Sequence, residues 1–139
     1  MPHSVEAAFL QAQAAQERFV VVRGRLEFDA RKLPKVDYDN QHDTPAMTLV
    51  EGELRGASLS AAGFSTPYRK NVTIAVACFG PWCASAKNGT DVLAFVEMAA
   101  EGNVISTNPC GGYLFTAPTK KMIRAVKSCF AGQACTPIR

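Results

Sequence analysis

Cysteines are the residues of this sequence whose type and spacing suggest covalent chemistry. They form two close pairs in the second half of the chain, Cys78 with Cys83 and Cys129 with Cys135, and Cys110 lies between the pairs. Short-range pairs beside glycine and proline are typical of disulfides in exported proteins. We therefore expect two disulfides, with Cys110 as a free thiol, paired to a cysteine that is not in this chain, or paired in place of a pair member. Cytosolic cysteines with no special role are the alternative.

The first pair brackets the segment Cys-Phe-Gly-Pro-Trp-Cys, which contains the only tryptophan, Trp82. A thioredoxin-like redox site needs two intervening residues and a helix N-terminus, whereas here four residues intervene and the Gly-Pro step favours a tight turn. We interpret the segment as a turn closed by a disulfide that contributes about 2 kcal/mol of stability. Free thiols, a Cys83–Cys110 pair and redox chemistry are the alternatives. Trp82 either shields the sulfur atoms or is an exposed contact residue, and with Tyr113 it is our candidate contact site.

Other catalytic or metal-binding constellations have little support in the sequence. The two histidines, His3 and His42, have no ligand-like spacing to the cysteines, so no zinc site is predicted. A thiol nucleophile at Cys110 would need one of the two histidines close in space. A thiol enzyme is therefore kept only as the second alternative function. The segment 37–43 begins like a calcium loop but has His42 and Thr48 where glycine and glutamate are required, which indicates a solvated acidic loop. We predict no cofactor, no metal and no catalytic residue, and we expect a protein that is not an enzyme.

Composition indicates one globular domain over residues 1–139. The chain is 47% hydrophobic and 19% charged, with a net charge of +3 and a pI of about 8.7, which argues against a dedicated nucleic-acid binder. No run of about 18 apolar residues is present, so no membrane span is predicted. The N-terminus lacks the basic and apolar regions of a signal peptide. We expect a secreted or periplasmic protein whose signal peptide is not part of this chain.

Hydrophobic periodicity predicts a helix, about five strands and a second helix. Residues 4–18 carry an apolar stripe at helical spacing after the N-cap residue Ser4. Strands are predicted at 19–29, 47–60, 71–78 and 92–99, with a broken strand in 103–116, while 30–46 and 61–70 are assigned to a loop and a turn region. In the final helix, 119–130, the residues predicted to face inward are Met122, Ile123, Val126, Cys129 and Phe130. Glycines inside the strands favour a strongly coiled sheet, so the predicted fold is mainly β, a small five-stranded closed barrel flanked by two helices.

The outward face of the final helix is basic. Its cationic residues are Lys120, Lys121, Arg124 and Lys127. Barrels of this size often bind oligonucleotides, usually with aromatic residues beside the basic ones, whereas here the aromatic residues occupy strand positions with a buried pattern. An oligonucleotide-binding protein that uses these four residues as its anion-binding site is therefore the first alternative, and a solvated helix face is the simpler interpretation.

The order of small motifs resembles the netrin-like family of OB-fold modules, which includes the tissue inhibitors of metalloproteinases, and looks closest to its prokaryotic exported branch. The matching features are the strand Val21–Leu26 with Gly24, the long strand 47–60, the Cys78-Phe79-Gly80 step, the segment Gly89–Phe95 and the cysteine Cys110 before the last helix. The resemblance covers about residues 4–130. It implies an OB-fold barrel and a non-catalytic module that binds another protein.

One departure from the family pattern limits what the resemblance implies. The animal inhibitors chelate the zinc of their target through an N-terminal Cys-x-Cys segment, whereas this chain begins Met-Pro-His-Ser and has no cysteine before Cys78. Inhibition of a metalloproteinase is therefore not implied. The expected function is binding of an unidentified protein partner, with the Trp82 loop as the contact.

Overall fold

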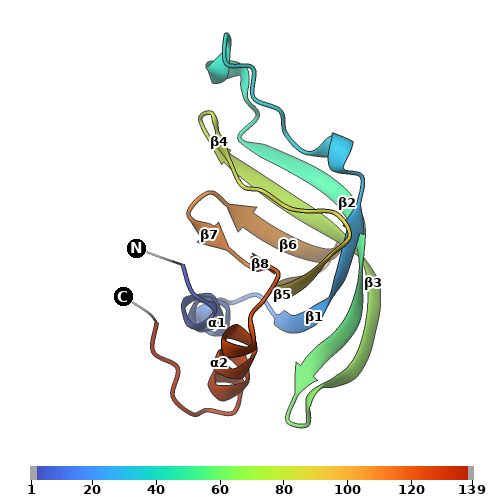
Figure 1. Ribbon diagram of the computed structural model, residues 1–139, viewed down its shortest axis with the longest axis vertical. Helices are drawn as coiled ribbons and strands as arrows, with labels where there is room; N and C mark the ends of the chain where they lie inside the picture. The colour runs from blue at the N-terminus through green and yellow to red at the C-terminus, as the bar shows by residue number, and fades with distance from the viewer. Residues whose placement is uncertain (1–2, 138–139) are drawn as a thin grey trace.

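The computed structural model describes residues 3–137 and is mainly β, with two helices. Figure 1 shows the helices α1 (Val5–Ala14) and α2 (Lys120–Phe130) together at one side of a curved sheet. The long strands are β1 (Phe19–Phe28), β2 (Met47–Ser60), β3 (Gly63–Phe79), β5 (Thr90–Ala99) and β6 (Gly102–Asn108). Three short strands complete the sheet: β4 (Trp82–Cys83), β7 (Gly111–Gly112) and β8 (Leu114–Thr116).

The five long strands pair in a ring. β1 lies antiparallel between β2 and β5, β3 follows β2, and β6 follows β5. The parallel pair between β3 and β6, with Ile74 opposite Ile105, joins the two ends of this path. The short strand β4 pairs antiparallel with the end of β3, while β7 pairs with β6 and β8 pairs with β5. The ring buries one face of every long strand.

Two apolar clusters stabilise this arrangement, one on each side of the β1–β5 pair. The first lies on the inner side of the strands and includes Val22, Leu26, Ile74 and Ile105, all fully buried. The second lies beneath the helices, where Phe95 and Leu93 of β5 pack against three buried helix residues, Val126, Val5 and Ala8. Because β5 contributes to both clusters, its residues 92–96 form a continuous apolar run.

Close backbone contact between β1 and β2 explains two of the strand glycines. Gly24 lies opposite Gly56 in the antiparallel register. A Cβ atom on Gly56 would collide with the carbonyl oxygen of Arg23, and one on Gly24 would collide with that of Arg55. Tyr68 of β3 lies opposite Gly56 and is buried. The predicted coiling of these strands thus has a steric basis, since only glycine permits the two backbones to approach this closely.

Helix α2 is amphipathic and capped at both ends. The Thr119 hydroxyl accepts from the Met122 N–H at 3.1 Å, and Gly132 follows the helix with φ +76°, as left-handed C-terminal residues do. Ile123, Val126 and Cys129 are buried as predicted, but Phe130 is 43% exposed. The prediction that Phe130 faces inward was wrong because this last residue of α2 borders an open depression with Leu59 and Phe95 rather than being enclosed.

Two predicted boundaries differ from the structure. Helix α1 ends at Ala14 rather than at residue 18, because the next strand begins at Phe19 and the chain needs a short extended connection. The turn region predicted for residues 61–70 was wrong, since β3 begins at Gly63 and runs through it. Pro67 suggested a turn, but it lies where β3 pairs with β2 alone, and a strand edge tolerates proline.

Candidate functional site

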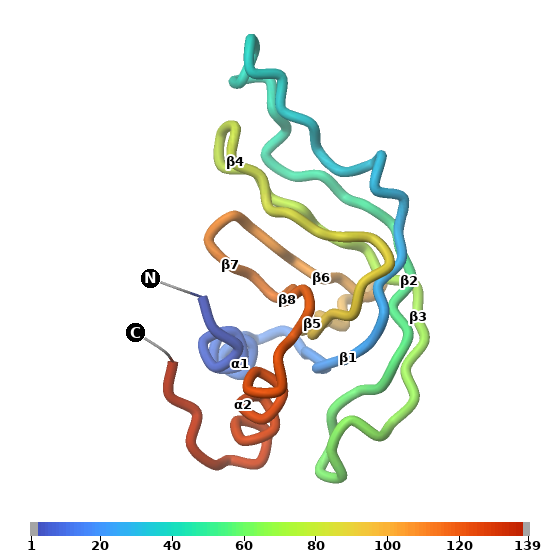
Figure 2. The backbone as a smooth tube through the Cα atoms, in the orientation of Figure 1, coloured from blue at the N-terminus to red at the C-terminus, as the bar shows by residue number. Residues whose placement is uncertain are grey.

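A surface groove of about 890 Å³ lies between the β3–β4 hairpin and the turn after β6. Figure 2 shows both turns at the same side of the molecule, with the N-terminal segment below them. The groove is lined by residues of three segments, His3, 81–85 and 107–111, together with Leu114 and Thr116. It is the candidate site, because Trp82 and Cys110, both selected from the sequence, lie in it.

The first wall of the groove is a hairpin fixed by a disulfide. Cys78 of β3 and Cys83 of β4 are cross-strand partners with their Cα atoms 3.9 Å apart, and their sulfur atoms are bonded. Gly80 has φ +63° at the first central position of the turn, where a left-handed conformation suits a two-residue hairpin connection. The predicted disulfide-closed turn is confirmed. Trp82 is held on a short constrained hairpin and is 70% exposed.

The second wall is the turn that carries Cys110. The Asn108 side-chain oxygen accepts from the Cys110 N–H at 2.9 Å, and the Thr107 hydroxyl donates to the Gly111 carbonyl at 3.4 Å. Gly111 and Gly112 have φ values of +149° and +101°, which L-residues with side chains rarely adopt. Cys110 is exposed and its thiol is free. The alternative Cys83–Cys110 pair is therefore not formed, because Cys83 bonds to Cys78.

His3 closes one end of the groove, and no sequence pattern placed it there. Its Nε2 atom donates to the Gly112 carbonyl at 2.6 Å, and its ring stacks on Phe115 with 5.3 Å between ring centroids. A Cβ atom on Gly111 would collide with the imidazole. The structure thus brings His3 next to the Cys110 turn. Within residues 3–137, however, the imidazole bonds to a backbone carbonyl and makes no hydrogen bond to the thiol, so the two do not form a nucleophile–base pair.

An exposed apolar stripe begins at the same hairpin. Phe79 and Trp82 are cross-strand partners, so their side chains share one face of the sheet. Met47 of β2 lies opposite Ala77 of β3 and therefore diagonal to Phe79, and Leu49 follows Met47 on the same face. The exposed fractions are 70% for Trp82, 49% for Phe79, 52% for Met47 and 64% for Leu49. We call these four residues the apolar stripe. Leu49 shares the strand phase of Glu51 and Glu53, which is the sequence signal that could have identified it.

Tyr113, the other predicted contact residue, lies away from the groove. Its ring packs on Phe19 and Phe95 with centroid distances of 4.9 and 5.9 Å. Burial and the carboxylates of Glu17 and Glu97 raise the pKa of its hydroxyl above the usual value near 10. Tyr113 therefore belongs to the cluster beneath the helices, and its position gives no support to a contact role shared with Trp82.

The acidic segment 37–43 precedes β2, which begins at Met47, and is structured by its own hydrogen bonds. The Asp37 carboxylate accepts from the Asn40 amide and the Asp39 N–H, and these bonds lower its pKa. A short helical turn, Gln41–Asp43, follows. Within the described part of the chain, no group of three or more His, Cys, Asp or Glu side chains is arranged to hold a metal ion.

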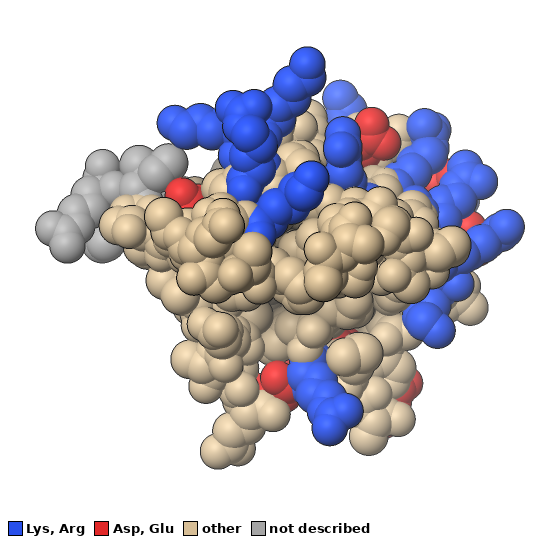
Figure 3. All heavy atoms as spheres, turned by 90° about the horizontal axis from the view of Figure 1, so that it is seen from below, with Lys and Arg blue, Asp and Glu red and all other residues tan. Residues whose placement is uncertain are grey.

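The four cationic residues of α2 border three depressions. Lys120 and Arg124 line one, Arg124 and Lys127 line a groove toward the β2–β3 turn, and Lys121 lies with Glu6 at the start of α1. Figure 3, viewed from the α2 end, shows that most charged side chains on this face are basic. All four are exposed as predicted. Among residues 3–137, no aromatic side chain lines the depression of Lys120 and Arg124, whereas Phe130 lines the groove that Arg124 shares with Lys127.

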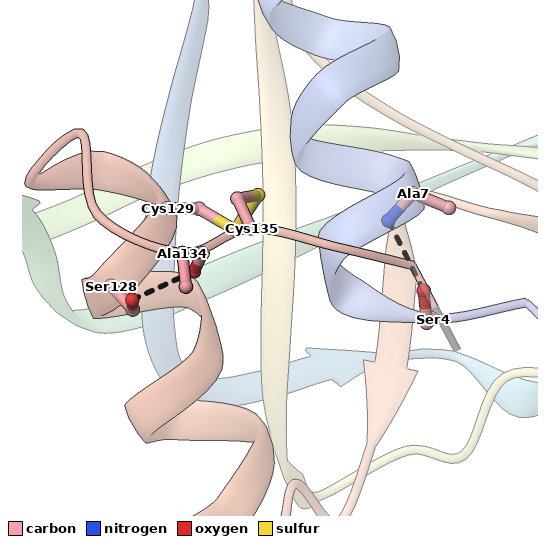
Figure 4. Close-up of a disulfide and its surroundings, with 6 residues drawn as sticks. All are labelled: Ser4, Ala7, Ser128, Cys129, Ala134 and Cys135. Atoms are coloured by element: carbon pink, nitrogen blue, oxygen red, sulfur yellow. Dashed lines mark hydrogen bonds between the residues drawn. A yellow bond between two sulfur atoms is a disulfide. The ribbon is translucent and has the colours of Figure 1, made fainter.

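The second disulfide holds the chain after α2. Cys129, buried in the last turn of the helix, bonds to Cys135, and the Ser128 hydroxyl donates to the Ala134 carbonyl at 2.8 Å (Figure 4). The same view shows the N-cap of α1, where the Ser4 hydroxyl accepts from the Ala7 N–H at 3.1 Å. The predicted Cys129–Cys135 disulfide is confirmed, and it fixes the segment after α2 rather than forming part of the groove.

Comparisons with known proteins give no family for this chain. No family model, no curated protein and no solved structure matches it. Neither described helix has the length and hydropathy needed to cross a membrane. The interpretation of function therefore depends on the site itself.

Proposed function

We propose that this chain is an exported, disulfide-linked, non-catalytic module that binds another protein through the Trp82 hairpin and the apolar stripe. We further propose that its fold is an OB-like five-stranded barrel of the netrin-like or inhibitor-like kind, without the Cys-x-Cys segment that chelates zinc. The exposed apolar stripe is the observation that carries the proposal.

The pattern of strand pairing supports the fold proposal. β1 to β2, β2 to β3, β5 to β6 and β1 to β5 are antiparallel, and the parallel β3–β6 pair joins the ends of the path. The close Gly24–Gly56 contact provides the strong coiling that a small closed barrel needs. The two short-range disulfides support export, because such bonds persist in oxidising compartments.

The apolar stripe supports binding to a protein. Large apolar side chains scattered singly on a surface need no explanation, but a contiguous exposed group marks an interaction site. Here four such side chains are neighbours across three strands, and the Cys78–Cys83 disulfide restrains the hairpin of two of them. Restraint before binding lowers the entropy lost on association. Aromatic anchors of this kind frequently carry most of the binding energy.

Charge near the stripe indicates the chemistry of the partner. Glu51 follows Leu49 on the same face of β2, and the segment before β2 carries Asp37, Asp39 and Asp43, while Glu53 is already paired with Arg69 at 3.4 Å. A surface that is apolar at its centre and acidic at its rim complements an apolar surface with basic residues around it. The proposed partner is therefore a protein that presents an apolar patch bordered by lysine or arginine.

The test is a photo-crosslinking experiment followed by a binding titration. A photoreactive phenylalanine analogue at Phe79, in protein produced in an oxidising compartment, should cross-link one partner, which is then purified. Because Trp82 is the only tryptophan, its emission should shift to shorter wavelength when a tryptophan-free fragment of this partner covers it. Trp82→Ala and Leu49→Ser should each weaken binding by about tenfold or more, measured by calorimetry.

Arg69→Gln is the matched control, since Arg69 is exposed on the same face of β3 but outside the stripe. It should change the affinity by less than about twofold. If Trp82→Ala and Leu49→Ser bind the partner as tightly as the control does, the stripe is not the contact surface. Loss of the native thermal transition in Trp82→Ala would also contradict the proposal, because Trp82 would then be a core residue.

A further inference from the structure

A small depression between β1 and α2 gathers positive charge from two distant parts of the sequence. It has a volume of about 260 Å³ and is lined by Arg23, Pro118, Lys120, Ile123 and Arg124. Arg23 lies on the outer face of β1, and Lys120 and Arg124 are one helical turn apart on α2. Three of the five lining residues are thus cations, and none carries a carboxylate.

Arg23, Lys120 and Arg124 have no ion-pair partner among residues 3–137, whereas the arginines Arg25, Arg55 and Arg69 of the sheet each have one. Arg55 and Arg25 lie 2.7 and 3.5 Å from the Glu27 carboxylate, and Arg69 lies 3.4 Å from that of Glu53. No described carboxylate lies within 4.0 Å of the charged groups of the three cations in the depression. The sequence itself explains part of this, because residues 102–139 contain no Asp or Glu.

The geometry of the cluster suits an oxyanion. Two guanidinium groups can each donate a pair of parallel hydrogen bonds to a tetrahedral oxyanion, and an ammonium group adds a third positive charge. Lys120 is also the first residue of α2, an 11-residue helix, where the positive end of the helix dipole favours an anion. The small volume favours a compact anion over stacked nucleobases, and within the described part of the chain the aromatic residue Phe130 belongs to the adjoining groove.

We propose that Arg23, Lys120 and Arg124 form a binding site for a compact phosphate or sulfate oxyanion, separate from the Trp82 groove. Lys121 and Lys127 do not line this depression, although Arg124 also borders the neighbouring groove that Lys127 lines. The site therefore contains two of the four cations selected from the sequence and one further arginine, Arg23, from the exposed face of β1.

The test is calorimetric titration of the oxidised full chain with inorganic pyrophosphate at low ionic strength. Wild-type protein should bind one pyrophosphate, with an affinity that falls as salt is added. Arg23→Gln and Arg124→Gln should each weaken binding by about tenfold, the loss expected for one charge-assisted hydrogen-bonded contact. Lys121→Gln and Arg69→Gln are matched controls that remove one exposed positive charge elsewhere and should change the affinity by less than about twofold.

Three results would overturn the proposal. Wild-type protein could fail to bind pyrophosphate, or the controls could weaken binding as much as Arg23→Gln does, which would indicate general charge attraction. The third result comes from a separate experiment, in which the protein is mixed with phosphatidylglycerol vesicles and with a ten-residue oligothymidylate. Binding to either of these without binding to pyrophosphate would show that the cations act on a lipid surface or a polynucleotide rather than on a compact anion.

Discussion

At the scale of single residues, the structure separates side chains that stabilise the fold from those that are free to bind. Tyr68 and Trp82 illustrate the difference. Tyr68 lies opposite Gly56 and belongs to the first apolar cluster, and its buried hydroxyl has no hydrogen-bond partner among the described residues. Trp82 is 70% exposed on a hairpin that its neighbours' disulfide already fixes. The first residue belongs to the core and the second is available to a partner.

Tyr68→Phe should not destabilise the protein. The substitution keeps the ring and removes a buried polar group without a partner, so the free energy of unfolding should stay equal or rise by up to about 1 kcal/mol. Urea denaturation of both proteins measures this difference. A loss of more than about 1 kcal/mol would mean that the hydroxyl makes a bond that stabilises the fold.

The same substitution should change the response to alkaline pH. Burial raises the pKa of Tyr68 above its usual value near 10, so the folded state holds this proton more tightly than the unfolded state does. Its contribution to stability is therefore complete below pH 10 and is lost as pH rises through the folded-state pKa. Wild-type protein should lose stability in this window more steeply than Tyr68→Phe. Thermal melts of both proteins at several pH values measure how steeply stability falls with pH. Equal slopes would show that Tyr68 makes no contribution to the pH dependence.

At the scale of elements, the sequence predicted the strands with clear alternation and missed those whose pattern depends on distant neighbours. β1, β2 and β5 were predicted within about two residues of their bounds, and both helices were found, because each has a local apolar period. The first half of β3 was missed since Pro67 suggests a turn unless one knows that this part of the strand is an edge. His3 and Arg23 were missed as site residues because their neighbours lie more than 90 residues away in sequence.

The Gly24–Gly56 contact gives a prediction for β1 and β2 as a pair. Gly56→Ala should destabilise the protein by about 2 kcal/mol, because the added methyl group would collide with the Arg23 carbonyl and Gly24 and force the strands apart. Ser58→Ala on the same strand is the control, with an expected change of about 0.5 kcal/mol or less. Chemical denaturation gives both values. Equal stabilities of the two variants would show that the strands separate without cost.

At the scale of the whole molecule, the two disulfides and the free thiol define an oxidation state that can be measured directly. Alkylation of the native protein before intact-mass analysis should modify one of the five cysteines, Cys110, and all five after reduction and unfolding. A Cys110→Ser variant should show no modification in the native state. Five modified cysteines in native protein from an oxidising compartment would contradict both disulfides and remove the support for export.

Reduction should also lower the stability of the whole molecule. The bonds close loops with sequence separations of 5 and 6 residues, so each is expected to contribute about 2 kcal/mol through the unfolded chain. Thermal melts with and without reductant measure the sum, and paired Cys→Ser variants measure each bond. An unchanged melting temperature after complete reduction would show that the core alone determines stability.

The parallel β3–β6 pair has a consequence for the order in which the chain folds. The β2–β3 and β5–β6 hairpins join strands separated by two residues each, and such short loops close at small entropic cost. The β3–β6 pair joins Ile74 to Ile105, and the β1–β5 pair joins Leu26 to Thr90, across much longer segments. Contacts of this separation slow folding. Until they form, the groove has only one wall, whereas the apolar stripe lies on the β2–β3 and β3–β4 pairs and needs local pairing alone. We therefore expect the apolar stripe to form with the local hairpins and the complete groove to form with the last and slowest contacts.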